Sequence, residues 1–122
     1  MSGSNFLVDT NFLIYLLNGH ASIVPYLNNN FFISEITEME MLGVKGLPAS
    51  VIKTRADLID NCFIVNFNSD IKTIAITIRQ QVSITLPDAI VASSALYMGM
   101  PLVTGDKDFE GIPDLNLKLL KL

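Results

Sequence analysis

The stretch Asn5-Phe-Leu-Val-Asp9-Thr-Asn11 joins a short apolar strand directly to an acid and two polar residues. A second stretch, Pro101-Leu-Val-Thr-Gly-Asp106, has the same form near the other end of the chain. Almost unbroken apolar strands are typical of a parallel sheet that is buried on both faces. Such sheets bind their ligands beyond the carboxyl ends of the strands. We therefore expect Asp9 and Asp106 at the functional edge of a parallel sheet.

Strand-like and helix-like runs alternate along the whole chain, which predicts an α/β fold with helices on both faces of the sheet. The expected strands are Phe6–Asp9, Phe31–Ser34, Cys62–Phe67, Pro101–Thr104 and Asn116–Lys121. The expected helices are Asn11–Leu17, Ser22–Leu27, Ser34–Val44, Pro48–Ile59, Ser69–Gln80 and Thr85–Met98. Ser69 or Asp70 is the expected N-cap of the fifth helix, and Gly99 is the stop signal of the last. No linker or repeat interrupts residues 1–122, which predicts a single domain.

The composition favours a cytoplasmic protein with more apolar residues than an average soluble domain. Hydrophobic residues make up 50% of the 122 residues, and the mean hydropathy is +0.45. No apolar run reaches the roughly 18 residues of a membrane span, and the start Met1-Ser-Gly-Ser4 has no signal-peptide character. We expect the excess apolar surface to be buried between subunits. The single Cys62 is expected to be a buried, inert thiol.

The net charge of −4, from eight bases and twelve acids, lacks the basic excess of most nucleic-acid-binding proteins. Four of those acids are candidates for one site, and without them the acids and bases are equal in number. The charge therefore neither supports nor excludes a nucleic-acid substrate. Arg55 and Arg79 are expected to be solvated bases on helix faces, with contact to a phosphate as the alternative. His20 is expected at the surface.

Acids stand beside apolar residues at four widely separated positions: Asp9, Glu40, Asp88 and Asp106. Each has an ordinary alternative role, as an N-cap, a helix edge, a charge in the first turn of a helix or a solvated loop residue. Carboxylates near a core must be neutralised, and a hard divalent cation does this with oxygen ligands. The pattern points to an enzyme that uses Mg²⁺ or Mn²⁺ and acts on phosphodiesters.

Helical spacing separates Glu40 from the other acids of its helix. At 100° per residue, Glu40 shares a face with Ile36 and Val44, whereas Glu35 and Glu38 fall on the expected solvent side. In the loop after the fourth strand, Asp108 is a weaker candidate than Asp106. Phe109, which follows Asp108, is expected to fill the core.

Four motifs in this order resemble the PIN-domain ribonucleases, and most closely the VapC-type toxins of bacterial toxin–antitoxin pairs. The motifs are Leu7-Val-Asp9-Thr-Asn11, Ile33-Ser-Glu-Ile-Thr37-Glu-Met-Glu40, Leu86-Pro-Asp88-Ala-Ile-Val-Ala92 and Leu102-Val-Thr-Gly-Asp106-Lys-Asp108-Phe109. The resemblance extends over nearly the whole chain. It implies a three-layer α/β/α sandwich with a five-stranded parallel sheet.

The resemblance also implies an activity and a site. It implies cleavage of single-stranded RNA by an endoribonuclease that holds one or two Mg²⁺ or Mn²⁺ ions. By motif, the acidic quartet is Asp9, Glu40, Asp88 and Asp106, and the supporting positions are Asn11, Thr104 and Asp108. Related toxins dimerise and are silenced by a cognate antitoxin, so we expect both partners here. Mutual repulsion among four close carboxylates should raise some of their pKa values in the absence of metal.

Two other classes of protein fit parts of the pattern. A receiver-type signalling domain has a similar length and alternation, but it requires an Asp after the third strand, where this chain has Phe67-Asn68. A PIN-like module that has lost catalysis would serve as a binding or scaffold protein. The presence of all four acids favours the enzyme over that module.

Overall fold

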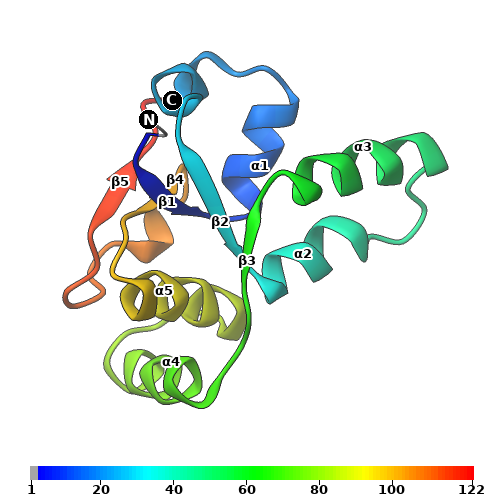
Figure 1. Ribbon diagram of the computed structural model, residues 1–122. Helices are drawn as coiled ribbons and strands as arrows, with labels where there is room; N and C mark the ends of the chain where they lie inside the picture. Colours follow the sequence, from blue (N-terminus) through cyan, green and yellow to red (C-terminus); the bar gives the residue numbers. More distant parts are fainter. Residues whose placement is uncertain (1–2) are drawn as a thin grey trace.

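Within residues 3–122, the computed structural model has a five-stranded sheet in the spatial order β3-β2-β1-β4-β5 (Figure 1). All neighbouring strands are parallel, so the expected fold class is confirmed. Met1 and Ser2, part of the start on which the expectation about a signal peptide rests, lie outside the described residues. The strands are β1 Asn5–Val8, β2 Asn30–Ser34, β3 Phe63–Val65, β4 Leu102–Thr104 and β5 Leu117–Leu119.

Helices cover both faces of this sheet. The α-helices are α1 Thr10–Leu17, α2 Glu35–Leu42, α3 Ala49–Asp60, α4 Ser69–Gln81 and α5 Leu86–Met98, and the short 3₁₀ helices are η1 Ala21–Tyr26 and η2 Lys107–Phe109. Successive strand residues point to opposite faces. Leu7 accordingly packs with residues of α4 and α5, while Phe6 and Val8 pack with residues of α1 and η1. The sheet is thus the middle layer of an α/β/α sandwich, as expected.

Two expected element boundaries are wrong for physical reasons. The third strand is β3, Phe63–Val65, and not Cys62–Phe67. It pairs only with β2 at the edge of the sheet, so Phe63 is 55% exposed in spite of its apolar sequence. The N-cap of α4 is Asn68 and neither Ser69 nor Asp70, because the Asn68 side chain accepts a 2.9 Å hydrogen bond from the Ile71 N–H. Gly99 ends α5 in the left-handed conformation with φ 66°, as expected.

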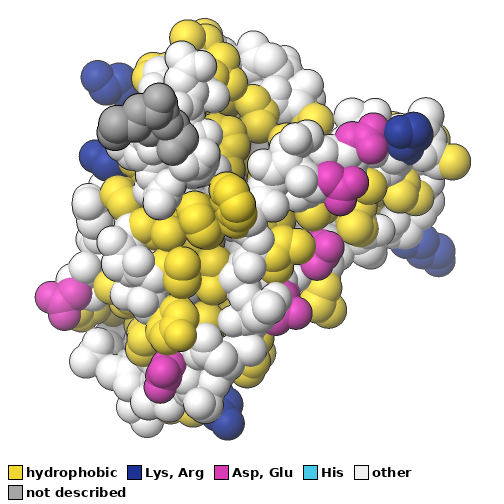
Figure 2. All heavy atoms as spheres, in the orientation of Figure 1, with side chains coloured by type: hydrophobic (Ala, Val, Ile, Leu, Met, Phe, Trp, Pro, Cys, Tyr) yellow, Lys and Arg dark blue, Asp and Glu magenta, His cyan; other side chains and the backbone are white. Residues whose placement is uncertain are grey.

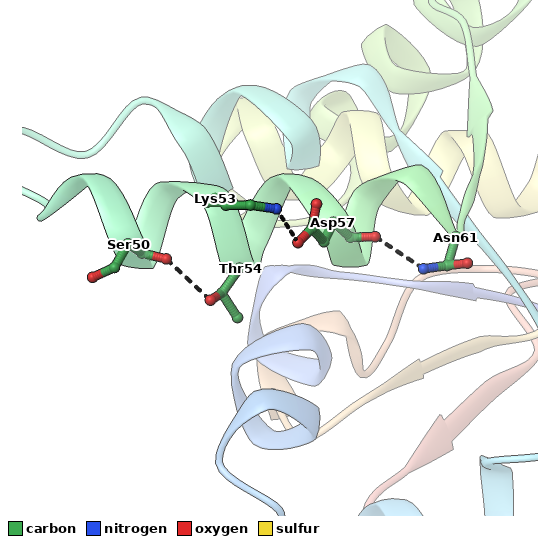
Figure 3. A network of polar contacts seen from close by, with 5 residues as sticks. All are labelled: Ser50, Lys53, Thr54, Asp57 and Asn61. Carbon is green, nitrogen blue, oxygen red and sulfur yellow. Dashed lines mark hydrogen bonds and ion pairs between the residues drawn. The ribbon is translucent and has the colours of Figure 1, made fainter.

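The helices α2 and α3 extend sideways from the sheet as an antiparallel pair (Figure 1). On α3, Lys53 forms a 3.0 Å ion pair with Asp57, within a row of contacts that begins at Ser50 (Figure 3). Both side chains are largely exposed, so the pair contributes at most about 1 kcal/mol. Arg55 is half-buried and donates a 2.9 Å hydrogen bond to the Met41 carbonyl. Its expected role as a solvated charge is therefore wrong, because it joins α3 to α2.

The surface carries many apolar side chains, which agrees with the high hydrophobic content. Figure 2 shows hydrophobic atoms over much of one face, with few charges among them. Met39 is 66% exposed, and Ile76 and Leu86 are each 52% exposed. In the part of the chain described, no helix is both long and apolar enough to cross a bilayer. Cys62 is half-buried rather than fully buried, and burial raises its pKa to about 11, so the thiol stays protonated at neutral pH.

Candidate functional site

Asp9 lies directly after β1 and is buried, with 6% of its surface exposed. Its Oδ1 accepts a 2.9 Å hydrogen bond from the Phe12 N–H, which makes it the N-cap of α1. Its Oδ2 accepts a 2.7 Å hydrogen bond from Thr104 Oγ1. One carboxylate therefore caps α1 through one oxygen and is joined to the end of β4 through the other.

Thr104 and Asn11 support this end of the sheet. Thr104, fully buried at the end of β4, also accepts a 3.0 Å hydrogen bond from the Asp106 N–H. Asn11 Oδ1 accepts a 2.8 Å hydrogen bond from the Gly105 N–H. A Cβ atom on Gly105 would lie only 2.8 Å from that same Asn11 oxygen, so a side chain there would push Asn11 out of its present position. Both polar residues thus hold the loop that carries Asp106.

Three carboxylates meet between the carboxyl end of β4 and the first turn of α5. One oxygen from each of Asp88, Asp106 and Asp108 lies within 4.8 Å of the other two. Asp88 is half-buried in the first turn of α5, where its N–H donates a 3.3 Å hydrogen bond to the N-cap Thr85. Asp106 Oδ1 accepts a 2.8 Å hydrogen bond from the Asp108 N–H. Asp108, the weakest candidate from sequence, therefore stands inside the cluster. The neighbouring Phe109 is 1% exposed and fills the core, as expected.

Glu40 lies outside that group of three, and its expected place away from the solvent side of the helix is wrong. The buried side of α2 is formed by Thr37 and Met41, and the helix ends at Leu42, before Val44. Glu40 is exposed, whereas Glu35 and Glu38, expected on the solvent side, are half-buried. Glu40 nevertheless faces the site, because its Oε1 accepts a 2.8 Å hydrogen bond from Thr10 Oγ1, next to Asp9.

Two of the acids have raised pKa values, as expected. Burial raises the pKa of Asp9 to about 6, against the lowering effect of its hydrogen bonds from Thr104 and Phe12. Repulsion by Asp106 and Asp88 adds to the rise. Burial is also the main cause that raises the pKa of Asp88, with smaller contributions from repulsion by Asp106, Glu40 and Asp108. The expected cause, mutual repulsion, is therefore real but secondary to desolvation.

The donor set fits a hard divalent cation. Mg²⁺ and Mn²⁺ prefer carboxylate oxygens, and oxygens of Asp88, Asp106 and Asp108 already converge. Lys53–Asp57 is the one ion pair among residues 3–122, so no basic side chain there forms an ion pair with the cluster. A bound cation would relieve both the repulsion and the cost of burying Asp9.

Three groups beside the acids were not assigned to the site from sequence. Thr10 binds Glu40, and Thr85 caps the helix that carries Asp88. Arg79, expected to be solvated, is exposed but lines a pocket of about 540 Å³ together with Asp88 and Asp108. Thr10 and Thr85 stand within three residues of an expected acid, and that spacing is the signal that could have identified them. Arg79 has no such signal, because only the packing of α4 against α5 brings it near.

Comparisons with known proteins agree with this geometry. The PIN domain family matches residues 6–115. A chain of a toxin–antitoxin complex from Klebsiella pneumoniae is 32% identical, with a TM-score of 0.77 over 92% of this chain and 94% of that one. For VapBC2 from Rickettsia felis, bound to a promoter DNA fragment, the identity is 25% and the TM-score 0.81, over 96% and 99% of the two chains. For VapBC-1 from nontypeable Haemophilus influenzae, the identity is 25% and the TM-score is 0.78, over 94% of this chain and 97% of that one. A comparison with curated proteins gave no match.

The chain belongs to the PIN domain family, because that family matches most of its length. The structural matches also confirm the resemblance to the VapC-type toxins of VapBC pairs.

Proposed function

We propose that this protein is a metal-dependent endoribonuclease that cuts single-stranded RNA and acts as the toxin of a toxin–antitoxin pair. The observation that carries the proposal is the meeting of Asp88, Asp106 and Asp108 beside the buried Asp9, in a chain of the PIN family. PIN domains are generally nucleases, and the acids lie where open α/β sheets bind their ligands. We assign the activity to a single domain over residues 1–122.

Asp9 and Asp88 would anchor Mg²⁺ or Mn²⁺, with Asp106 and Glu40 completing the site directly or through water. Asp108 joins this set because its carboxylate lies beside those of Asp88 and Asp106. When bound, the ion supplies an activated water and stabilises the charge that develops on the phosphate. The chain contributes positioning: Thr104 orients the Asp9 carboxylate, and Asn11 holds the loop that carries Asp106.

The proposed partners follow from the exposed apolar surface and from the matched structures. Toxin–antitoxin complexes such as that from Klebsiella pneumoniae match this chain over most of its length. We assign a cognate antitoxin and a second copy of this chain as the groups that cover side chains such as Met39, Ile76 and Leu86. The cytoplasm, where such a toxin meets RNA, is the proposed location.

Cleavage of a labelled single-stranded RNA by the purified, partner-free protein tests the function. The reaction is run with Mg²⁺, with Mn²⁺ and with EDTA, for the native chain and for Asp9→Asn. Asp57→Asn is the matched control, because Asp57 is an exposed acid on α3 that pairs with Lys53. We expect metal-dependent cutting that Asp9→Asn removes and Asp57→Asn leaves unchanged. Metal binding without cleavage of any RNA tested would favour the catalytically silent binding module instead.

A further inference from the structure

A pocket adjoins the acidic cluster on the side of the loop between α4 and α5. Its volume is about 540 Å³, within the range of roughly 300–1,000 Å³ common for small-molecule sites. It is lined by Arg79, Ser83, Ile84, Thr85, Asp88 and Asp108. Two of the clustered carboxylates thus share one pocket with a guanidinium group and with the hydroxyls of a Ser and a Thr. The pocket therefore offers anion-binding and cation-binding groups side by side.

Arg79 is held at this pocket and forms no ion pair with the carboxylates of residues 3–122. Its Nε lies 3.4 Å from the Ile84 carbonyl, to which it donates, so the side chain rests against the α4–α5 loop. Among residues 3–122 the only ion pair is Lys53–Asp57, so Arg79 is paired with none of the carboxylates described. The terminal nitrogens of a guanidinium form a planar fork that fits a phosphate through two parallel hydrogen bonds.

An acidic site in a chain of net charge −4 repels the backbone of RNA, so substrate binding needs a local cation besides the metal. Within residues 3–122, Arg79 is the one basic residue that lines the pocket with Asp88 and Asp108. Lys107 stands between Asp106 and Asp108 in sequence but does not line this pocket. Lys72 lies two turns before Arg79 on α4 and lines only the adjoining apolar groove, with Ile76 and Leu86.

We propose that Arg79 binds a phosphate of the substrate strand next to the phosphate that is cut, and that the pocket beside Asp88 and Asp108 receives the intervening nucleotide. The inference rests on the proposed function, because it assigns a substrate contact to the same site. Arg79 acts as a binding and positioning residue: it sets how the strand crosses the acids and takes no part in bond breaking.

Binding is measured first, in the Asp9→Asn background and with Mg²⁺ present, by the anisotropy of a short labelled single-stranded RNA. Arg79→Ala should weaken binding about tenfold, the size of one charge-assisted contact. It should also reduce the slope of log affinity against log salt by about 0.7, the value for one phosphate on a single strand. Arg79→Lys keeps the charge but loses the planar guanidinium fork, so its affinity for the RNA should fall about threefold. Lys72→Ala, which removes the same charge from the same helix, should change affinity less than twofold.

Equal losses for Arg79→Ala and Lys72→Ala would overturn the inference, since they would show a general charge effect. Steady-state cleavage by the otherwise native chain separates the two proposals. A raised KM in Arg79→Ala with kcat nearly unchanged supports the role in binding the strand. An unchanged KM overturns that role while the nuclease stands. RNA binding that depends on Arg79 in a native chain that cuts no RNA would instead overturn the nuclease and retain the binding site.

A dimer interface over the adjoining groove is the competing explanation for an exposed Arg79. Sedimentation of the same variants tests it, because an interface residue would change the oligomeric state. Loss of self-association in Arg79→Ala, in parallel with the loss of RNA binding, would overturn the direct phosphate contact.

Discussion

Thr104 Oγ1 donates a 2.7 Å hydrogen bond to Asp9 Oδ2 and so joins two residues that lie 95 positions apart in sequence. Both are buried, at the ends of the adjacent parallel strands β4 and β1. The same hydroxyl accepts a hydrogen bond from the Asp106 N–H, so one small side chain connects two acids of the site. This hydrogen bond also lowers the pKa of Asp9 against the larger effect of burial.

Replacing Thr104 by Val, which has nearly the same shape, tests this connection. The variant leaves a buried oxygen of Asp9 without its donor, so we expect a loss of about 1–3 kcal/mol in the free energy of unfolding. Metal-dependent cleavage should fall about 10- to 100-fold, as for other groups that orient a metal ligand.

Thr37→Val is the control for that variant. Thr37 is also fully buried, but its Oγ1 has no hydrogen-bond partner among the described residues. Removing an unsatisfied hydroxyl should leave stability unchanged or raise it. Urea denaturation measures both variants, and equal losses for the two would show that the Thr104 hydroxyl has no special role.

Asp9→Asn should separate stability from activity. Loss of a charged metal ligand should reduce cleavage at least about 100-fold, more than loss of an orienting group. The metal-free fold should be retained or become more stable at neutral pH, because the variant removes a buried charge whose pKa is raised to about 6. Circular dichroism and thermal unfolding in EDTA measure the second effect. A variant that cleaves fully with metal would rule out Asp9 as a ligand.

The raised pKa of Asp9 predicts how stability depends on pH in the absence of metal. Its value is about 6 in the folded protein and 3.8 in an unperturbed chain, so between these pH values the folded state binds more protons. Stability should therefore fall as pH rises from about 4 to 6, by roughly 3 kcal/mol from this residue. The raised pKa of Asp88 acts in the same direction. Urea midpoints in EDTA across this range should show the fall, and Asp9→Asn should flatten it.

Metal should stabilise the protein, because an ion that binds only the folded state raises the melting temperature as its concentration rises. We expect Mn²⁺ and Mg²⁺ to raise the Tm and to reverse part of the loss of stability between pH 4 and 6. Asp108→Asn should weaken this effect, since the Asp108 carboxylate lies with those of Asp88 and Asp106. Asp57→Asn should leave it unchanged. A full metal response in Asp108→Asn would place Asp108 outside the metal site.

Much of the fold followed from local pattern. Apolar runs bounded by polar turns located all five strands, and the Gly99 stop was confirmed with φ 66°. Errors came where the environment overrode the pattern. The third strand was expected to be longer than it is. It lies at the edge of the sheet, where Phe63 is exposed in spite of its apolar side chain. The orientation of α2 was assigned from helical spacing that extended to Val44, whereas the helix ends at Leu42, and its buried side is Thr37 and Met41.

The sequence by itself determined the parallel α/β class and supplied the candidate acids, because strand hydrophobicity and the order of the motifs can be read without any tertiary contact. Only the tertiary structure decided how those acids relate. It placed Asp108 within the cluster, linked Glu40 to Thr10 from an exposed position and brought Arg79 to the same pocket. It also made burial rather than repulsion the main cause of the raised pKa of Asp9. These facts depend on distances between distant segments and on exclusion of water, and packing alone sets both.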